Sequence, residues 1–201
     1  MKLRYSPASP FVRKVLVQAM ETGLDGRIER VPTATADPAS GLSKENPLGK
    51  VPSLTTDEGV HLYDSPVICE YLDGLHGGTK MFPAAGAARW TVLRRQALAD
   101  GMMDAAVARR LESLRPVSEQ SPSAMAGQRG KVLAGLDALE AEADKLGDSV
   151  DIGLISIACA LGYLDFRFAN EDWRSGRPRL NRWFEAFSRR PSLQATLPKS
   201  A

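Results

Sequence analysis

Residues Ser6–Lys14 read Ser-Pro-Ala-Ser-Pro-Phe-Val-Arg-Lys. They follow a short segment in which apolar and polar residues alternate, and they lead into a segment with helical periodicity. Ser9 before Pro10 is typical of a helix start, because serine caps free backbone N–H groups and proline fits the first helical position. Such a start carries unpaired donors and the positive end of the helix dipole. We therefore expect an anion, including a thiolate, to be stabilised beside Ser9.

The segments on either side of this stretch predict a strand, a helix and a second strand. Lys2–Tyr5 alternates between apolar and polar residues, as a strand does. After Pro10 the apolar residues recur at helical spacing and form one stripe on a helix that ends at Gly23. Arg27–Val31 has the composition of a second strand. A strand, helix and strand this close in sequence favour a right-handed crossover and a parallel strand pair.

The next stretch predicts a loop, a hairpin and a second helix start. Residues 32–50 are rich in Pro, Ala, Ser, Thr and Gly, so we expect a surface loop with at most a weak helix. Two short strands follow at 51–55 and 60–63, with a turn between them. Asp64-Ser65-Pro66 then repeats the helix-start pattern before apolar residues at helical spacing. We expect Ser65 to cap this second helix.

The remainder of the chain predicts helices only. Residues 79–86 lie in a stretch rich in Gly, Pro and Ala, which we interpret as a linker between a first domain, 1–78, and a second, 87–201. The second domain should contain four helices, at about 87–115, 124–146, 148–168 and 180–187. The third of these is apolar on almost every side, so we expect it to be the buried centre of a helical bundle.

The composition is that of an ordinary globular protein, with 43% hydrophobic and 25% charged residues in a length of 201. A formal net charge of +2 is too small to indicate nucleic acid as the main partner. No signal-peptide core or membrane-spanning run is present, which predicts a cytoplasmic protein without a membrane partner. Cys69 and Cys159 form no Cys-x-x-Cys pair, so we expect buried free thiols and neither a redox dithiol nor a metal site.

Several motifs, in this order, resemble one known family. The first half contains Ser6–Lys14, then Asn46-Pro47-Leu48-Gly49-Lys50-Val51-Pro52, and then Asp64-Ser65 before a helix. The second half contains Asp151-Ile152 leading to residues 160–165, and it ends in Arg190-Pro191-Ser192. Over nearly the whole chain these features resemble the bacterial glutathione S-transferase family, of the cytosolic type with serine at the thiol-activating position. The resemblance implies a thioredoxin-like N-terminal domain (βαβ-α-ββα) and an all-helical C-terminal domain.

The resemblance also implies a glutathione site in the first domain. It makes Val51-Pro52 a cis peptide, whose turn exposes the Val51 backbone N–H and C=O to the cysteinyl part of glutathione. It assigns Ser65 to the γ-glutamyl carboxylate and Asp64 to the γ-glutamyl ammonium. Lys50 is a candidate for the glycyl carboxylate, although a solvated loop lysine would look the same in the sequence.

Ser9 is the candidate catalytic residue. A thiol attacks electrophiles as its thiolate, and a helix N-terminus together with a hydroxyl donor lowers the thiol pKa. Ser9 would donate a hydrogen bond to the glutathione sulfur and would not itself attack the substrate. Tyr5 and Ser6 are alternatives, although strand alternation places Tyr5 with Leu3 in the core. Arg13, one turn along the helix, is either a source of positive potential or an ordinary exposed arginine.

The helical domain adds two predictions. Asp148-Ser149-Val150-Asp151 has the form of a capping box, with Asp148 at the cap and Asp151 three positions on, and we give both a structural role. By resemblance, the long helix that begins near residue 87 lines the pocket for a second substrate. Methionine and aromatic residues at helical spacing are more often core. The candidate pocket residues are Trp90, Met102, Met103, Ala106 and Arg109.

These expectations combine into one leading hypothesis. The protein would be a glutathione transferase with a detoxification role, which uses glutathione as co-substrate and attacks an electrophilic small molecule. We expect a homodimer without a metal. Two alternatives stay open: glutathione-dependent peroxide or disulfide reduction, and a binding or regulatory protein that keeps the scaffold without activity. The electrophile is not identified by sequence, because its specificity lies in a pocket built by distant helices.

Overall fold

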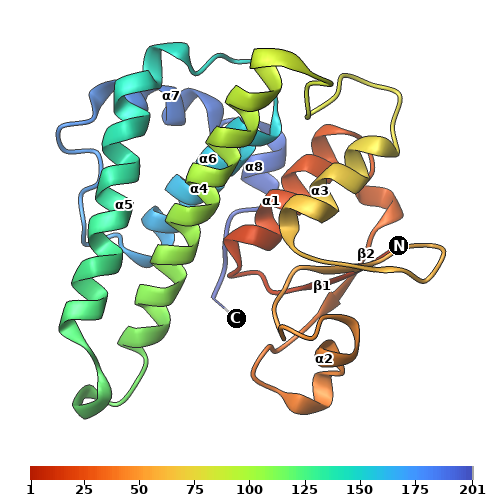
Figure 1. The fold of residues 1–201 in the computed structure, drawn as a ribbon, viewed down its shortest axis with the longest axis horizontal. Coiled ribbons are helices and arrows are strands. Elements are labelled where there is room, and N and C mark those ends of the chain that lie inside the picture. The colour runs from red at the N-terminus through yellow and green to blue at the C-terminus, as the bar shows by residue number, and fades with distance from the viewer. Residues whose placement is uncertain (201) are drawn as a thin grey trace.

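The computed structural model describes residues 1–200 and consists of an α/β domain followed by a helical domain (Figure 1). The first domain, coloured red to yellow, lies beside the longer helices of the second, coloured green to blue. This arrangement confirms the expected α/β plus all-α fold. The proposed boundary at residues 79–86 stays a prediction.

The sheet of the first domain has four strands in the order β2-β1-β3-β4. Strands β1 (Lys2–Tyr5) and β2 (Glu29–Pro32) are parallel and are joined through helix α1 (Pro10–Glu21), which confirms the predicted crossover unit. Strands β3 (Ser53–Thr55) and β4 (His61–Leu62) form the predicted hairpin, and β3 pairs antiparallel with β1. Strand β1 is therefore central, and the loop that follows it leaves the middle of the sheet.

Two helices cover one face of this sheet. Helix α1 packs beside α3 (Ser65–Gly74) on that face, and the short α2 (Leu42–Glu45) lies away from them (Figure 1). Leu3 of the central strand is completely buried, as are Leu54 of β3 and Leu72 of α3. Burying a leucine side chain contributes about 1.5–3 kcal/mol. This apolar contact fixes the N-terminal ends of α1 and α3 relative to the sheet.

Among residues 1–200, the helical domain contains five α-helices. Its long pair is α4 (Gly86–Ser113) and α5 (Pro122–Glu142), which the sequence predicted to within a few residues. The central helix α6 (Ile152–Arg167) packs against α4 and against α1 of the first domain. Helix α7 (Pro178–Phe187) follows, and then α8 (Pro191–Ala195), which was not predicted because five residues carry too little periodicity. Within residues 1–200, no helix is long and apolar enough to cross a membrane.

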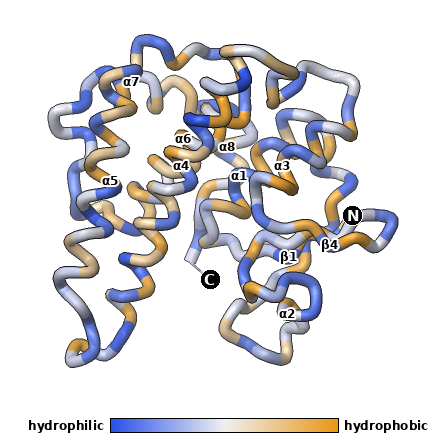
Figure 2. Tube along the Cα trace, in the orientation of Figure 1, coloured by the Kyte–Doolittle hydropathy of each residue, from blue (hydrophilic) through white to orange (hydrophobic). Residues whose placement is uncertain are grey.

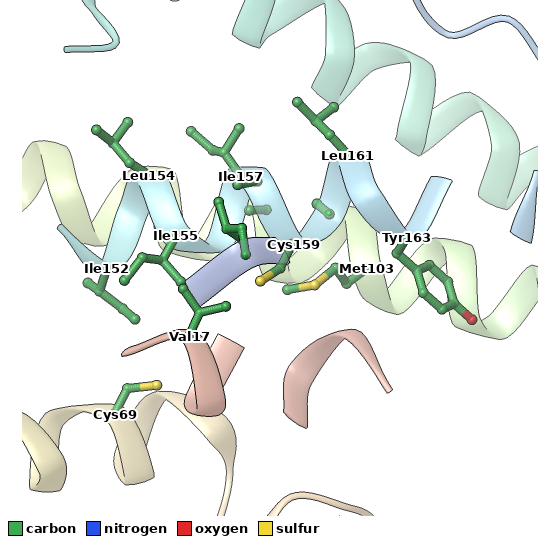
Figure 3. Close-up of a cluster of buried hydrophobic side chains, with 14 of the residues drawn as sticks. Val17, Cys69, Met103, Ile152, Leu154, Ile155, Ile157, Cys159, Leu161 and Tyr163 are labelled. Atoms are coloured by element: carbon green, nitrogen blue, oxygen red, sulfur yellow. The ribbon is translucent and has the colours of Figure 1, made fainter. Parts of the chain in front are cut away.

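Helix α6 is the buried centre of the molecule, as predicted. Ile152, Ile155 and Leu161 are completely buried, and neighbouring side chains of α1, α3 and α4 lie around them (Figure 3). Figure 2 shows hydrophobic residues along α6, whereas the outer helices and the segment around α2 have mixed hydropathy. Because α6 touches both domains, its burial holds the two domains together as well as the bundle.

The start of α6 corrects one prediction. The N-cap is Asp151, whose side chain accepts a hydrogen bond from the Leu154 backbone N–H at 2.8 Å. Asp148, the expected cap, lies three residues before this position, and the backbone at Asp151 is still extended. The helix begins only where the continuous apolar run begins, because burial of that run determines which turn is helical. The expected capping box is therefore wrong, and Asp151 alone caps the helix.

Polar contacts also join the two domains. Lys14 of α1 is completely buried, and its Nζ lies 2.7 Å from both carboxylate oxygens of Asp100 on α4. Arg13 is also buried and donates to the Leu193 carbonyl at 3.0 Å. The alternative of an exposed helical arginine at position 13 is thus wrong, because α8 packs against α1 and covers this side chain.

Candidate functional site

A cavity of about 480 Å³ lies where the two domains meet. One wall, which we call the sheet wall, contains Ser6, Ser9, Lys50 and Val51 from the first domain. The opposite wall, which we call the helical wall, contains residues of α4 and α6. The volume lies within the range typical of small-molecule sites, which are about 300–1,000 Å³.

Ser9 lies where the sheet wall meets the first turn of α1. It is the N-cap residue, with extended backbone dihedrals, and its Oγ accepts a hydrogen bond from the Val12 N–H at 3.3 Å. Pro10 follows at the first helical position, so the predicted helix start is confirmed. A hydroxyl that accepts one hydrogen bond still has its own proton to donate. Ser9 can therefore cap α1 and donate to an anion in the cavity.

The two alternatives to Ser9 differ in position. Ser6 also lines the cavity, and its carbonyl accepts a hydrogen bond from the Ser9 N–H at 3.1 Å. Tyr5 is partly buried and packs against the core of the first domain instead. The structure thus brings Ser6 and Ser9 together at the cavity and leaves Tyr5 outside its lining.

Val51 presents backbone groups to the cavity. The Val51–Pro52 peptide bond is cis, as the resemblance implied. Among residues 1–200, no hydrogen bond joins the Val51 N–H or C=O to another residue. The turn before it is held by Asn46, which is buried and whose Nδ2 donates to the Lys50 carbonyl at 2.8 Å. The result is a fixed loop that offers one backbone donor and one acceptor to a ligand.

The start of α3 differs from the prediction. Asp64 is the N-cap residue, and its carboxylate accepts from the Ser65 N–H. Ser65 is the first helical residue and does not cap, because aspartate one position earlier already fills that role. Its side chain is 1% exposed, and its Oγ has no hydrogen-bond partner in the described chain. A buried hydroxyl without a partner is costly. Neither Asp64 nor Ser65 is among the residues that line the cavity.

The helical wall is not made of the residues expected from the sequence. Met102, Met103 and Ala106 are buried in the core, and Trp90 is 68% exposed outside the cavity. Arg109 points elsewhere and forms an ion pair with Glu171. All five predicted pocket residues on α4 are therefore outside the cavity lining.

The face of α4 that does line the cavity lies next to its buried face. It carries Asp104, Val107, Arg110, Leu111 and Leu114. The most apolar face of α4 packs on α6. The cavity is lined by the neighbouring face of the same helix, because each residue is rotated by about 100° from the one before it. The spacing of Val107, Leu111 and Leu114 is a second helical repeat, which is the signal that could have identified this face.

Two groups on the helical wall have perturbed pKa values. Burial raises the pKa of the Asp104 carboxyl above its usual range, and the positive charge of Lys50 opposes that rise. Burial also raises the pKa of the Tyr163 hydroxyl on α6, against the effect of the neighbouring Arg167. Tyr163 is therefore a neutral hydrogen-bond donor at physiological pH.

The cysteines do not belong to this site. Cys69 and Cys159 are completely buried, and neither lines the cavity. Burial raises the pKa of Cys69 to about 12 and that of Cys159 to about 11, so both are inert thiols. Within residues 1–200, no group of three or more His, Cys, Asp or Glu side chains is placed to hold a metal ion.

Comparison with family models shows what the chain resembles. Residues 8–75 match the model of the N-terminal domain of glutathione S-transferase, and residues 104–186 match the model of its C-terminal domain. A curated relative, the protein YibF of Escherichia coli (strain K12), is described as an uncharacterized GST-like protein. It is 38% identical over 204 residues, which cover 100% of both chains.

This chain is also similar to solved structures of family members that have glutathione or a glutathione derivative bound. A glutathione transferase family member from Pseudomonas fluorescens Pf-5 with bound glutathione is 45% identical, covers 99% of each chain and has a TM-score of 0.94. A family member from Pseudomonas fluorescens Pf-5 with bound S-(propanoic acid)-glutathione is 44% identical over 100% of each chain, with a TM-score of 0.91. A glutathione S-transferase from Methylobacillus flagellatus with glutathione bound is 38% identical, covers 98% of this chain and 99% of that one, and has a TM-score of 0.92.

Proposed function

The chain belongs to the glutathione S-transferase family, and from this premise we propose that it binds glutathione in the cavity and activates its thiol for attack on an electrophilic small molecule. The proposal rests on the unpaired polar groups of the sheet wall. Val51 offers a free backbone N–H and C=O, and Ser9 offers a hydroxyl proton. Relatives with glutathione bound support the choice of ligand.

The parts of glutathione would be held by separate groups. The unpaired hydroxyl of Ser65, at the positive end of the α3 dipole, suits the γ-glutamyl carboxylate. Asp64 is exposed, negatively charged and adjacent, which suits the γ-glutamyl ammonium, although its carboxylate also caps α3. The Val51 backbone would pair with the cysteinyl peptide groups. Lys50, on the cavity wall, would then lie near the glycyl carboxylate.

Ser9 would favour the thiolate form of the bound thiol. Its hydroxyl would donate to the sulfur, and the N-terminus of α1 would add positive potential at the same point. The thiol proton leaves to water, and the sulfur electron pair forms a bond to the electrophilic carbon. The leaving group departs with the electrons of the bond that breaks. Ser9 thus stabilises negative charge on sulfur before attack and forms no covalent bond.

Binding and product analysis test this function against its alternatives. We expect calorimetry to show glutathione binding, and 1-chloro-2,4-dinitrobenzene to give a thioether by mass spectrometry. Peroxide or mixed disulfide as second substrate would instead yield glutathione disulfide, which identifies a reductase. Binding without any turnover would identify a regulatory protein. A protein that binds no glutathione would refute the proposal.

We also propose that the protein forms a homodimer through an exposed apolar area of α3 and α4. Trp90 on α4 is 68% exposed and Val67 on α3 is 48% exposed. Arg89 and Glu70, on the same two helices, form an ion pair at 2.9 Å that holds the helices together there. We expect sedimentation to show a dimer that Trp90→Glu dissociates. Val117→Glu, at another exposed apolar residue, should leave it intact; a monomeric wild type would contradict the dimer.

A further inference from the structure

The helical wall carries two arginines without carboxylate partners. Arg110 on α4 and Arg167 on α6 both line the cavity, and neither forms an ion pair within residues 1–200. Arg109, the neighbour of Arg110 in sequence, shows the usual alternative, because it is paired with Glu171. Two unpaired guanidinium groups in one cavity leave donors available for a negatively charged ligand.

The side chain of Arg167 is held in place from one side. Its guanidinium carbon lies 4.1 Å from the centroid of the Phe166 ring, and its Nε is buried without a hydrogen-bond partner in the described chain. Stacking on an aromatic ring uses the flat face of a guanidinium and leaves its N–H groups at the edge, where they can donate. Arg167 is therefore positioned to donate to a planar anion.

Tyr163 completes a group of donors with these two arginines. It precedes Arg167 by one helical turn, and its ring packs edge-on against Phe166 at 6.5 Å. Its hydroxyl points away from the buried cluster of α6 (Figure 3). Burial raises the pKa of this hydroxyl, whereas the positive charge of Arg167, its hydrogen bonding to the hydroxyl and the positive charge of Arg110 act to lower it.

The cavity is polarised along α4. Asp104 is influenced by Lys50, Asp64 and Lys14, which belong to the first domain. Arg110 lies six residues further along the helix, about 9 Å away at 1.5 Å per residue. Val107 lies between Asp104 and Arg110. Leu111 and Leu114, which are 60% and 61% exposed, lie beyond Arg110. Along α4, Arg110 is therefore flanked by apolar side chains on both sides, so a ligand on this wall meets positive charge next to apolar surface.

We propose that Arg110, Arg167 and Tyr163 bind a carboxylate of the second substrate, so that the protein selects electrophiles in which an apolar segment ends in a carboxylate. Two guanidinium forks and a neutral hydroxyl match the in-plane acceptors of that group. This inference rests on the proposed function, because it takes the sheet wall to hold glutathione. The arginines would then set specificity, and Ser9 would act on the sulfur in the same way for every substrate.

Matched glutathione thioethers test the assignment without requiring turnover. S-carboxyalkyl glutathiones with one, two and three methylene groups would be compared by calorimetry with the corresponding carbamoyl compounds, which have the same shape and no charge. For at least one length, we expect wild type to bind the acid about tenfold or more tighter than the amide, as for hydrogen bonds between charged groups. Arg110→Gln and Arg167→Gln should each reduce this preference, and the double variant should abolish it.

Two controls make each outcome decisive. Arg182→Gln removes the same charge at an exposed position outside the cavity and should keep the preference. Glutathione itself should bind all variants equally, which also shows that they are folded.

If glutathione binds but wild type shows no acid preference, or the double variant keeps it, the proposal is overturned and the proposed function stands. If the variants lose glutathione affinity to the same degree, the arginines serve glutathione and the proposal is again wrong. Failure of wild type to bind glutathione would overturn both.

Discussion

The two walls of the cavity are built in different ways. The sheet wall offers backbone groups and small hydroxyls at a helix start and a turn, such as Ser9 and Val51. The helical wall offers longer charged side chains, such as Arg110 and Arg167, from the faces of two packed helices. Backbone groups are the same whatever the surrounding side chains are, whereas helix faces change with each substitution. We infer that the sheet wall serves the constant co-substrate and the helical wall serves the variable one.

The largest expected effect, on the free energy of unfolding, is at the Lys14–Asp100 contact, which joins the two domains. Lys14→Met would leave the partly buried Asp100 carboxyl, whose pKa burial already raises, without its partner. The free energy of unfolding should fall by about 3–5 kcal/mol, measured by urea titration. The double variant Lys14→Met/Asp100→Leu should recover most of this loss. A double variant as unstable as the single one would show that packing, not the unpaired charge, explains the effect.

A test of the proposed glutathione contact at the start of α3 comes next. Ser65→Ala should weaken glutathione binding by about tenfold or more, the expected loss of a hydrogen bond to a charged group, without loss of stability. The stability should hold because the Ser65 Oγ has no protein partner. Ser53 is a matched control, since its Oγ is also buried without a partner but lies in strand β3. Equal effects of Ser53→Ala and Ser65→Ala on glutathione affinity would contradict the assignment.

The helical wall depends on close approach of its two helices. A Cβ atom at Gly153 of α6 would lie 2.8 Å from the Val92 carbonyl oxygen of α4, whereas one at Gly101 of α4 would meet nothing. Gly153→Ala should therefore destabilise the protein by about 1–3 kcal/mol in thermal unfolding. Gly101→Ala should stabilise it by about 0.5–1 kcal/mol, because alanine favours the helix. The same sign for both variants would argue against tight packing at Gly153.

A pH-dependent contact gives the smallest effect. Arg190 and Ser192 hydrogen-bond Glu21 of α1 and hold the pKa of this carboxyl below its usual range. A lowered folded-state pKa gives stability that is present above the unfolded pKa, about 4.3, and is lost as the pH falls through the folded value. Glu21→Gln should cost no more than about 1 kcal/mol at pH 7, because the pair is partly solvated. Urea titrations should show a smaller difference in unfolding free energy between wild type and Glu21→Gln at pH 3 than at pH 7. The same difference at both pH values would contradict a stabilising ion pair between Glu21 and Arg190.

The contrast between the walls also explains how much the sequence could predict. The helix start at Ser9-Pro10 was predicted correctly, because capping depends on residues a few positions apart. The burial of α6 was predicted from its continuous apolar run. The cap of α3 was misassigned to Ser65 because two good capping residues are adjacent, and local sequence does not decide between them.

The errors on the helical wall have a different cause. Helix α4 has two neighbouring apolar faces, and tertiary packing decides which of them α6 covers and which of them lines the cavity. The burial of Arg13 and Lys14 likewise depends on partners 180 and 86 residues away in the chain. Long-range packing of this kind leaves no signal in the local pattern.

The central claim is that Ser9 stabilises a thiolate of bound glutathione, and thiolate absorbance as a function of pH tests it directly. In wild type, the thiol pKa should be lower for bound than for free glutathione. Ser9→Ala should raise the bound value by about one to two pKa units, the equivalent of one hydrogen bond to a charged group. Ser6→Ala and Tyr5→Phe, the matched controls, should leave it unchanged. A bound pKa that Ser9→Ala does not alter, with glutathione still bound, would contradict the account.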